Sequence, residues 1–181
     1  MRIGLISDTH IPVATDKIPP QVKEVFQGVD LILHAGDIYV VRVLDELQSI
    51  APVLAARGDD DFGAVVADER VEEEHSLLFG GIRVSLSHVI EHPQLLRDRM
   101  RSLRARTPPQ QHPNLTKEWS GNVTDIFVFG DTHQDIIDYY QGFLLVNPGS
   151  PTLPNYISKP GTVGLLTITP GKVEAQIIQL G

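Results

Sequence analysis

Aspartate and histidine side chains follow one apolar segment after another along this 181-residue chain. In chain order, these residues are Asp8, His10, Asp37, Asp59, His88, Asp131 and His133. Carboxylate oxygens and imidazole nitrogens are ligands that suit Mn²⁺, Mg²⁺, Fe and Zn²⁺. Because open α/β sheets collect their binding residues at the carboxyl ends of strands, we expect these side chains to converge. The pattern therefore predicts one polynuclear metal site.

Each of these fragments also has a simpler explanation. The pair Ser7-Asp8 after a strand is commonly a helix cap or a turn, and Gly-Asp, as at Gly36-Asp37, is among the commonest turn dipeptides. Turn geometry gives no reason to place a carboxylate or an imidazole after strand upon strand. The order and position of the whole set favour the metal site.

The elements that must position these residues follow from hydrophobic periodicity and turn signals. Strands are expected near residues 2–7, 30–35, 52–57, 75–79, 82–86, 124–129, 135–140, 143–146, 162–169 and 172–179. Helices are expected near 19–27, 39–49 and 93–106. The early alternation of strand and helix is typical of parallel βαβ units, and the last third is rich in strands. We expect one domain over residues 1–181, built as a two-sheet sandwich.

The motifs resemble those of the calcineurin-like metallophosphoesterases, in particular their small single-domain bacterial and archaeal phosphodiesterases. That pattern runs Asp-x-His, Gly-Asp, Gly-Asn-x-Asp, a lone His, Gly-His-x-His and Asn-Pro-Gly-Ser. The matching segments are Asp8-Thr9-His10, Gly36-Asp37, Gly58-Asp59-Asp60-Asp61, His88, Gly130-Asp131-Thr132-His133 and Asn147-Pro148-Gly149-Ser150. The resemblance implies an α/β fold, a four-layer αββα sandwich of two mixed sheets flanked by helices.

The resemblance also implies two divalent metal ions that share Asp37. One ion would be held by Asp8, His10, Asp37 and His133. The other would be held by Asp37, Asp59, His88 and Asp131. Among these ligands, the expected catalytic residues are Asp37, His88 and His133.

Two positions depart from the family pattern, since Asp59 replaces an Asn and Asp131 replaces the first His of Gly-His-x-His. Both changes add a carboxylate to the second site. Oxygen ligands shift the preference toward harder ions, so we expect Mn²⁺, with Mg²⁺, Fe or Zn²⁺ as alternatives. Four carboxylates would also balance the charge of two divalent ions.

The function implied by the resemblance is a phosphodiesterase that acts on a small phosphoester substrate through a dinuclear centre and a bridging hydroxide. Many relatives carry a His where this chain has Asp60, and an exposed Asp is a poor acid for protonating a leaving group. The alternative is a non-catalytic metal-binding scaffold or interaction protein on the same fold, because the small subunit of the retromer coat looks similar at Gly-Asp-x-Asp. Asp131 distinguishes the two hypotheses. The loss of an imidazole at this position could either change the metal preference of the second site or prevent that site from working.

Composition limits the partners. The formal net charge of −8 works against tight sequence-independent binding to nucleic acid, which depends on Lys and Arg. The absence of cysteine excludes disulfides and thiolate metal sites. No apolar run approaches the roughly 20 residues needed to cross a bilayer, and no basic leader precedes the first strand. We therefore expect a cytoplasmic protein without membrane attachment, and a homo-oligomer is left open.

Other residues admit more than one interpretation. The proline- and amide-rich segment 106–114 is either a solvated loop or a flap that brings His112 or Trp119 to the substrate. We interpret His34 as a buried, hydrogen-bonded histidine, and His75 and His112 as surface residues. His92 is a candidate substitute ligand if its loop turns inward. The Asn147-Pro148-Gly149-Ser150 turn is expected to support the metal site with hydrogen bonds.

Overall fold

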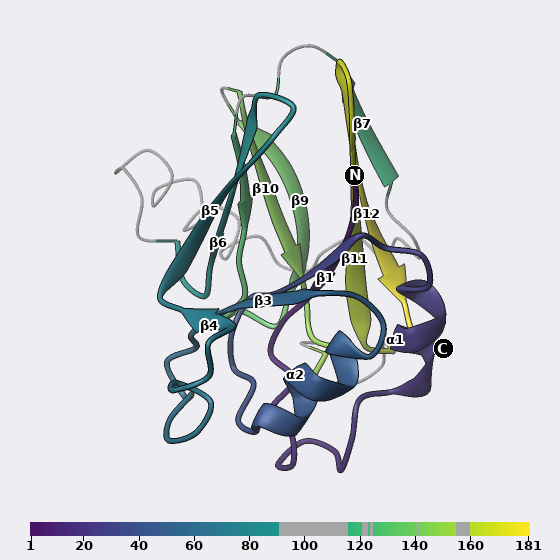
Figure 1. The fold of residues 1–181 in the computed structure, drawn as a ribbon. Coiled ribbons are helices and arrows are strands. Elements are labelled where there is room, and N and C mark those ends of the chain that lie inside the picture. Colours follow the sequence, from purple (N-terminus) through teal and green to yellow (C-terminus); the bar gives the residue numbers. More distant parts are fainter. Residues whose placement is uncertain (91–115, 121–122, 124, 141, 155–159) are drawn as a thin grey trace.

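The computed structural model describes residues 1–90, 116–120, 123, 125–140, 142–154 and 160–181. In these residues two β-sheets face each other, and two helices lie against one of them (Figure 1). The larger sheet has the strand order β4-β3-β2-β1-β11-β12-β7. Its strands are β1 (Arg2–Ile6), β2 (Leu31–His34), β3 (Val53–Ala56), β4 (Val71–Glu72), β7 (Thr116–Ser120), β11 (Thr162–Thr169) and β12 (Lys172–Gln179).

The smaller sheet has the strand order β5-β6-β8-β10-β9. Its strands are β5 (Glu74–Phe79), β6 (Ile82–Ser87), β8 (Asp125–Val128), β9 (Asp135–Tyr140) and β10 (Phe143–Pro148). Both sheets are mixed. Strands β1 to β4 pair in parallel in the larger sheet, and β6, β8 and β10 do so in the smaller one. Parallel neighbours end at the same sheet edge, which brings their carboxyl-terminal loops together.

The core between the sheets follows from the two-residue period of a strand. Ile3 and Leu5 of β1 pack into the inter-sheet core with Val84 of β6 and Val128 of β8. Ile6 of β1 joins the core on the other face, beneath the helices. Strands β1 and β2 are therefore apolar on both faces, as expected for strands buried inside a layered α/β fold.

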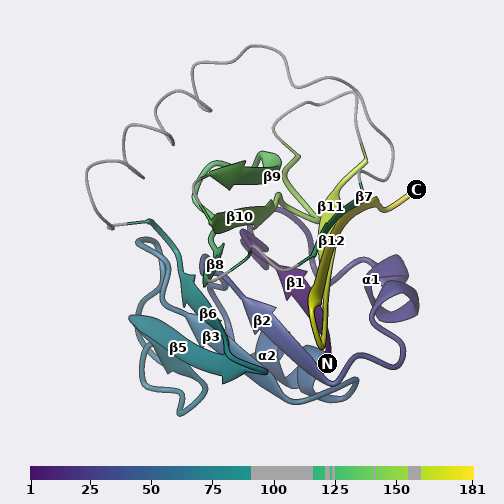
Figure 2. The ribbon, with the colours of Figure 1, turned by 90° about the horizontal axis from the view of Figure 1, so that it is seen from above.

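The helices α1 (Pro20–Val25) and α2 (Val41–Gln48) cover the face of the larger sheet that is turned away from the smaller sheet (Figure 2). Val43, Leu44 and Leu47 of α2 are buried against that sheet, at the spacing of one helical face. Gly4 allows the Phe26 ring to approach β1, because a Cβ at that position would stand 3.0 Å from the ring. Among the described residues, no helix is long and apolar enough to cross a membrane.

The predicted α/β sandwich of two mixed sheets is confirmed. The expected strands are found within one or two residues of their predicted bounds, and the two early helices are shorter than predicted. The helix expected at 93–106, the segment 106–114 and His92 lie outside the described residues. Two strands were not predicted, the two-residue β4 and the edge strand β7. The backbone of Trp119 in β7 pairs with that of Val173 in β12, so Trp119 belongs to a strand and not to a loop.

Candidate metal centre

Left-handed backbone conformations mark the loops at the strand ends. Asp8, His10, Asp37, Asp131 and His133 have φ angles of 53°, 45°, 58°, 69° and 53°. Such conformations are uncommon for residues other than glycine and cost free energy. Their concentration at residues with metal-binding side chains indicates that the loops are shaped to aim those side chains.

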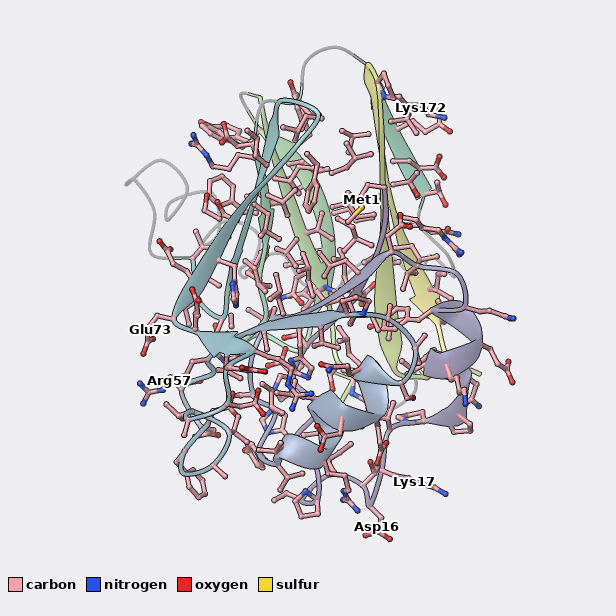
Figure 3. All side chains as sticks on the ribbon, in the orientation of Figure 1. Met1, Asp16, Lys17, Arg57, Glu73 and Lys172 are labelled. Carbon is pink, nitrogen blue, oxygen red and sulfur yellow. The ribbon has the colours of Figure 1, made fainter. Side chains whose placement is uncertain are left out.

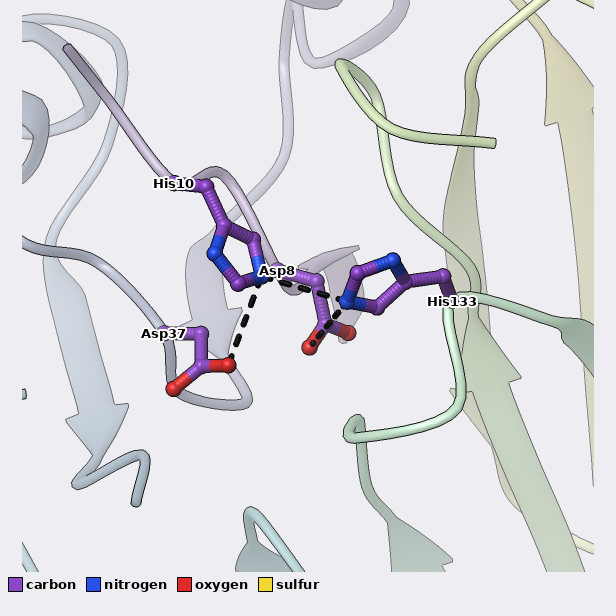
Figure 4. A group of neighbouring side chains, drawn as sticks. All are labelled: Asp8, His10, Asp37 and His133. Carbon is purple, nitrogen blue, oxygen red and sulfur yellow. Dashed lines mark hydrogen bonds and ion pairs between the residues drawn. The ribbon is translucent and has the colours of Figure 1, made fainter. Parts of the chain in front are cut away.

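A first group of side chains consists of Asp8, His10, Asp37 and His133, whose ligand atoms all lie within 4.8 Å of one another (Figure 4). His10 Nε2 lies 3.3 Å from Asp37 Oδ2 and 3.1 Å from His133 Nε2. His133 Nε2 lies 3.7 Å from Asp8 Oδ1. These are the four residues that the resemblance implies for one ion, brought together from the ends of β1, β2 and β8.

A second group consists of Asp37, Asp59 and His88. His88 Nε2 lies 2.9 Å from Asp59 Oδ1 and 3.6 Å from Asp37 Oδ2. His88 Nδ1 lies 2.7 Å from the Ala35 carbonyl oxygen, which can only accept, so Nδ1 is the protonated nitrogen. In the neutral ring, Nε2 is then left with a lone pair that points toward the two carboxylates. Asp37 belongs to both groups, as a bridging ligand would.

Asp131 belongs to neither group of the described residues. Its backbone N–H donates to Asp8 Oδ1 over 3.2 Å, so its main chain lies beside the first group. Of the four predicted ligands of the second ion, the structure therefore gathers three. The role of Asp131 as a ligand stays a prediction.

Burial controls the protonation of the acidic groups. It raises the pKa of Asp8 from 3.8 to about 7 and that of Asp37 from 3.8 to about 6. Asp8 is fully buried, and its Oδ2 has no hydrogen-bond donor among the described residues. A divalent cation would compensate these buried carboxylates. The donor set thus fits a metal ion.

The three imidazoles differ in basicity. Burial lowers the pKa of His10 and of His133, which favours the neutral rings that metal binding requires. Burial also lowers the pKa of His88, but the hydrogen bond to Ala35 and the charge of Asp37 outweigh it and raise the pKa above its usual value. His88 must therefore lose a proton more often than the other two before it can bind an ion.

The sequence analysis missed Asp61 as an organiser of the site. Its carboxylate is buried and accepts hydrogen bonds from the backbone N–H groups of Asp37, Ile38, Tyr39 and Gly58, over 2.8 to 3.1 Å. These bonds tie the loop after β2 to the loop after β3. The only signal in the sequence was the match of Gly58-Asp59-Asp60-Asp61 to Gly-Asn-x-Asp, because Asp61 fills the last position of that pattern and was assigned no role.

Two glycines permit the close packing of these loops. A Cβ at Gly58 would overlap the backbone and carboxylate of Asp37, and a Cβ at Gly36 would overlap the His88 ring. Gly36 also has a φ of 91°, which favours glycine. The glycines before Asp37 and Asp59 are therefore required for the geometry of the second group.

The end of β10 and the turn that follows it support the centre as expected. Asn147 Nδ2 donates to the Gly130 carbonyl over 2.7 Å, and the Ser150 hydroxyl donates to the Asp8 carbonyl over 2.7 Å. His34 is fully buried, with Nε2 3.2 Å from the Thr9 hydroxyl, in agreement with its interpretation. The surface assignment of His75 is wrong. Its ring is buried, and its Nε2 lies 2.8 Å from the Ala55 carbonyl oxygen, a contact that joins β5 to β3.

A pocket of about 880 Å³ opens beside the second group. Asp59 and His88 line it together with Arg57, Glu73 and Val89. Arg57 Nη1 and Glu73 Oε1 form an ion pair of 2.8 Å, and both side chains reach outward, Arg57 from the end of β3 and Glu73 from the residue between β4 and β5 (Figure 3). The pocket could therefore hold a substituent of a ligand that is bound at the metal centre.

Comparison with known proteins identifies relatives of the whole chain. The model of the calcineurin-like phosphoesterase superfamily domain matches residues 1–171. A probable metallophosphoesterase from Methanothermobacter thermautotrophicus is 37% identical over 183 residues, which cover 100% of this chain and 94% of that protein.

Solved structures share the fold. The structure of Vps29 from Chaetomium thermophilum has a TM-score of 0.73 and 21% identity, with 100% of this chain and 89% of that chain covered. An archaeal phosphodiesterase has a TM-score of 0.67 and 22% identity, with 99% and 100% covered. At these sequence identities, the two structural similarities show a shared fold and nothing about function.

Proposed function

The chain belongs to the calcineurin-like phosphoesterase superfamily, and from this premise we propose that it is a divalent-metal-dependent phosphodiesterase with a dinuclear centre. One observation carries the proposal, the membership of Asp37 in both ligand groups. A carboxylate shared by two groups of metal-binding side chains is the arrangement needed to hold two ions side by side.

The proposed ligands divide into two sets. Asp8, His10, Asp37 and His133 would hold one ion, and Asp37, Asp59 and His88 would hold the other. Asp131 would complete the second set by a change of its side-chain position. We propose that the two divalent ions are Mn²⁺, because with Asp131 the second set would contain three carboxylates and one imidazole. The ions would supply Lewis acidity and a water nucleophile ionised near neutral pH.

The residues of the chain orient these ligands. The backbone N–H of Asp60 donates to Asp37 Oδ1 over 3.2 Å, and the N–H of Asp131 donates to Asp8 Oδ1. Such hydrogen bonds fix ligating carboxylates in position. The substrate phosphoryl group would bind at the two groups, and one of its ester substituents would occupy the pocket beside Asp59 and His88.

Hydrolysis of an aryl phosphodiester by the purified protein tests the proposal. Activity should appear on addition of Mn²⁺ and disappear in Asp37→Asn, which removes the shared carboxylate. Asp16→Asn is a matched control, because Asp16 is exposed and its side chain points away from the molecule (Figure 3). Full activity in Asp37→Asn would show that the hydrolysis does not arise at this centre.

The second candidate is a non-catalytic metal-binding scaffold. It is favoured by the position of Asp131 outside the second group and by the exposure of the Asp59 side chain, 74%. A protein that binds Mn²⁺ but hydrolyses neither diesters nor monoesters would establish this alternative. The cytoplasmic location and the single domain stay predictions, and a homo-oligomer is still left open.

A further inference from the structure

Three side chains form a chain of hydrogen bonds that leads away from the first ligand group. His10 Nδ1 lies 2.7 Å from the Tyr39 hydroxyl oxygen. The same hydroxyl donates to Asp60 Oδ2 over 3.0 Å. His10 Nε2, on the opposite side of the ring, faces Asp37 and His133. Tyr39 therefore contacts a proposed metal ligand on the side that the metal would not occupy.

The hydrogen-bonding capacity of these groups sets the direction of the chain. A carboxylate can only accept, and a phenol has one hydrogen to donate. Because the Tyr39 hydroxyl donates to Asp60, its remaining role toward His10 is that of an acceptor. His10 must then carry its hydrogen on Nδ1. In the neutral ring, Nε2 presents a lone pair toward Asp37 and His133.

We propose that Tyr39 is a positioning residue that holds His10 in the Nδ1–H tautomer, and that Asp60 maintains this role by accepting the Tyr39 hydrogen. The inference rests on the proposed metal centre, to which it adds two residues that bind no ion. It also gives Asp60 a function other than leaving-group protonation, since its carboxylate accepts a hydrogen bond.

Contacts with the surrounding residues fix the position of Tyr39. Its φ is 75°, and its backbone N–H donates to Asp61 Oδ1 over 2.8 Å. Its ring meets the His10 ring edge to face, with centroids 4.8 Å apart and an interplanar angle of 71°. A strained conformation of this kind persists only where the surrounding contacts hold it in place. Backbone, ring and hydroxyl of Tyr39 are therefore all fixed against His10.

His88 provides an internal comparison. Its Nδ1 donates to the Ala35 carbonyl, a backbone group that no substitution removes. The corresponding acceptor for His10 is a side chain. Conservative substitutions can thus change the tautomer of His10 while that of His88 stays constant.

The direct test is the tautomer of His10 in metal-free protein labelled with ¹⁵N-histidine. Long-range ¹H–¹⁵N correlation spectra distinguish the two neutral tautomers, and His10→Gln assigns the signal. The parent and the matched control Tyr140→Phe, which removes a phenol hydroxyl from β9, should show His10 as Nδ1–H. Tyr39→Phe should lose this preference, and His88 should remain Nδ1–H in every variant.

Mn²⁺ affinity gives a second readout. Removing a hydrogen-bond partner of a metal ligand typically lowers affinity by about 10- to 100-fold, and we expect a loss of this size at the first group in Tyr39→Phe. Asp60→Ala should cause a smaller loss. Because both residues act through the same series of hydrogen bonds to His10, the double variant should bind Mn²⁺ no more weakly than Tyr39→Phe alone.

Two results would overturn the inference: an unchanged Nδ1–H signal of His10 in Tyr39→Phe, or losses of affinity that add in the double variant. Its failure is distinguishable from failure of the proposed function, because neither readout requires catalysis. A protein with the expected tautomers and Mn²⁺ affinities that hydrolyses no phosphoester would refute the phosphodiesterase and support the inference.

Discussion

Removal of the Asp61 carboxylate should destabilise the protein more than removal of any exposed acidic group. Asp61 is 2% exposed and accepts four backbone hydrogen bonds. In Asp61→Ala those four donors lose their acceptor inside the molecule. An unsatisfied buried donor costs about 1–3 kcal/mol, and water can reach some of the donors once the side chain is gone. We therefore expect a loss of about 4 kcal/mol in the free energy of unfolding.

Asp61→Asn divides this effect between the two oxygens. The N–H groups of Ile38 and Tyr39 donate to Oδ1, and those of Asp37 and Gly58 donate to Oδ2. An amide keeps one oxygen and places an N–H donor opposite the other pair. The expected loss is about 2 kcal/mol, roughly half that of Asp61→Ala.

Urea denaturation of the metal-free protein measures both losses. For a chain of this size about 1 kcal/mol corresponds to a shift of roughly 2–4 °C in Tm, so Asp61→Ala should also melt roughly 8–16 °C lower. Asp16→Ala is the control, because its side chain is exposed. A loss below about 1 kcal/mol in Asp61→Ala would refute the reasoning that Asp61 holds the two loops together.

Four further predictions concern the metal centre and the residues beside it. Burial raises the pKa of Asp37 from 3.8 to about 6 and of Asp8 from 3.8 to about 7, so Mn²⁺ affinity should rise with pH through this range as both carboxyls ionise. Titration calorimetry in buffers of different ionisation enthalpy should detect the released protons, and pH-independent affinity would contradict the shifts. The metal-free protein should show the opposite dependence on pH. The stability that the two protonated carboxyls contribute is complete below pH 3.8 and is lost as pH rises through about 6 and 7. The midpoint of urea denaturation should fall accordingly. The double variant Asp59→Asn/Asp131→His should shift the preferred ion from Mn²⁺ toward Zn²⁺, because two carboxylates become an amide and an imidazole; identical metal-dependence curves for variant and parent would place both residues outside the ligand set. At saturating Mn²⁺, Asp60→Ala should change aryl and alkyl diester hydrolysis equally little, whereas a selective loss on alkyl diesters would show that Asp60 protonates the leaving group.

Most of the architecture was predictable because local patterns determine it. The burial of β1 and β2 on both faces follows from their continuous apolar runs, and the single buried face of α2 follows from its helical spacing. Strand β7 was not predictable in the same way. Its only described pairing is with β12, more than 50 residues later in the chain, and no local signal encodes such a pairing.

The residues of the two groups could be proposed as ligands from the sequence because each one follows a strand, whereas Asp131 lies outside both groups. The structure gathers Asp8, His10, Asp37 and His133 as the resemblance implied. The residues that support them were harder to predict. Tyr39 and Asp61 act through hydrogen bonds that depend on left-handed loop conformations, and residue type alone does not reveal these.

His75 illustrates the opposite error. A histidine without a motif, near acidic residues, resembles a surface residue in the sequence. In the structure its ring is buried and hydrogen-bonded to the carbonyl of Ala55, which belongs to the other sheet. A contact across two sheets cannot be inferred from spacing along one strand.

Anomalous scattering from a crystal soaked in Mn²⁺ shows whether two ions bind side by side at Asp37. The proposed centre predicts two peaks, one among Asp8, His10, Asp37 and His133 and the other among Asp37, Asp59 and His88. The first site should be occupied at the lower Mn²⁺ concentration, because all four of its predicted ligands already lie close together. Absence of a peak between Asp37 and His133 at saturating Mn²⁺ would show that these residues do not form a metal centre.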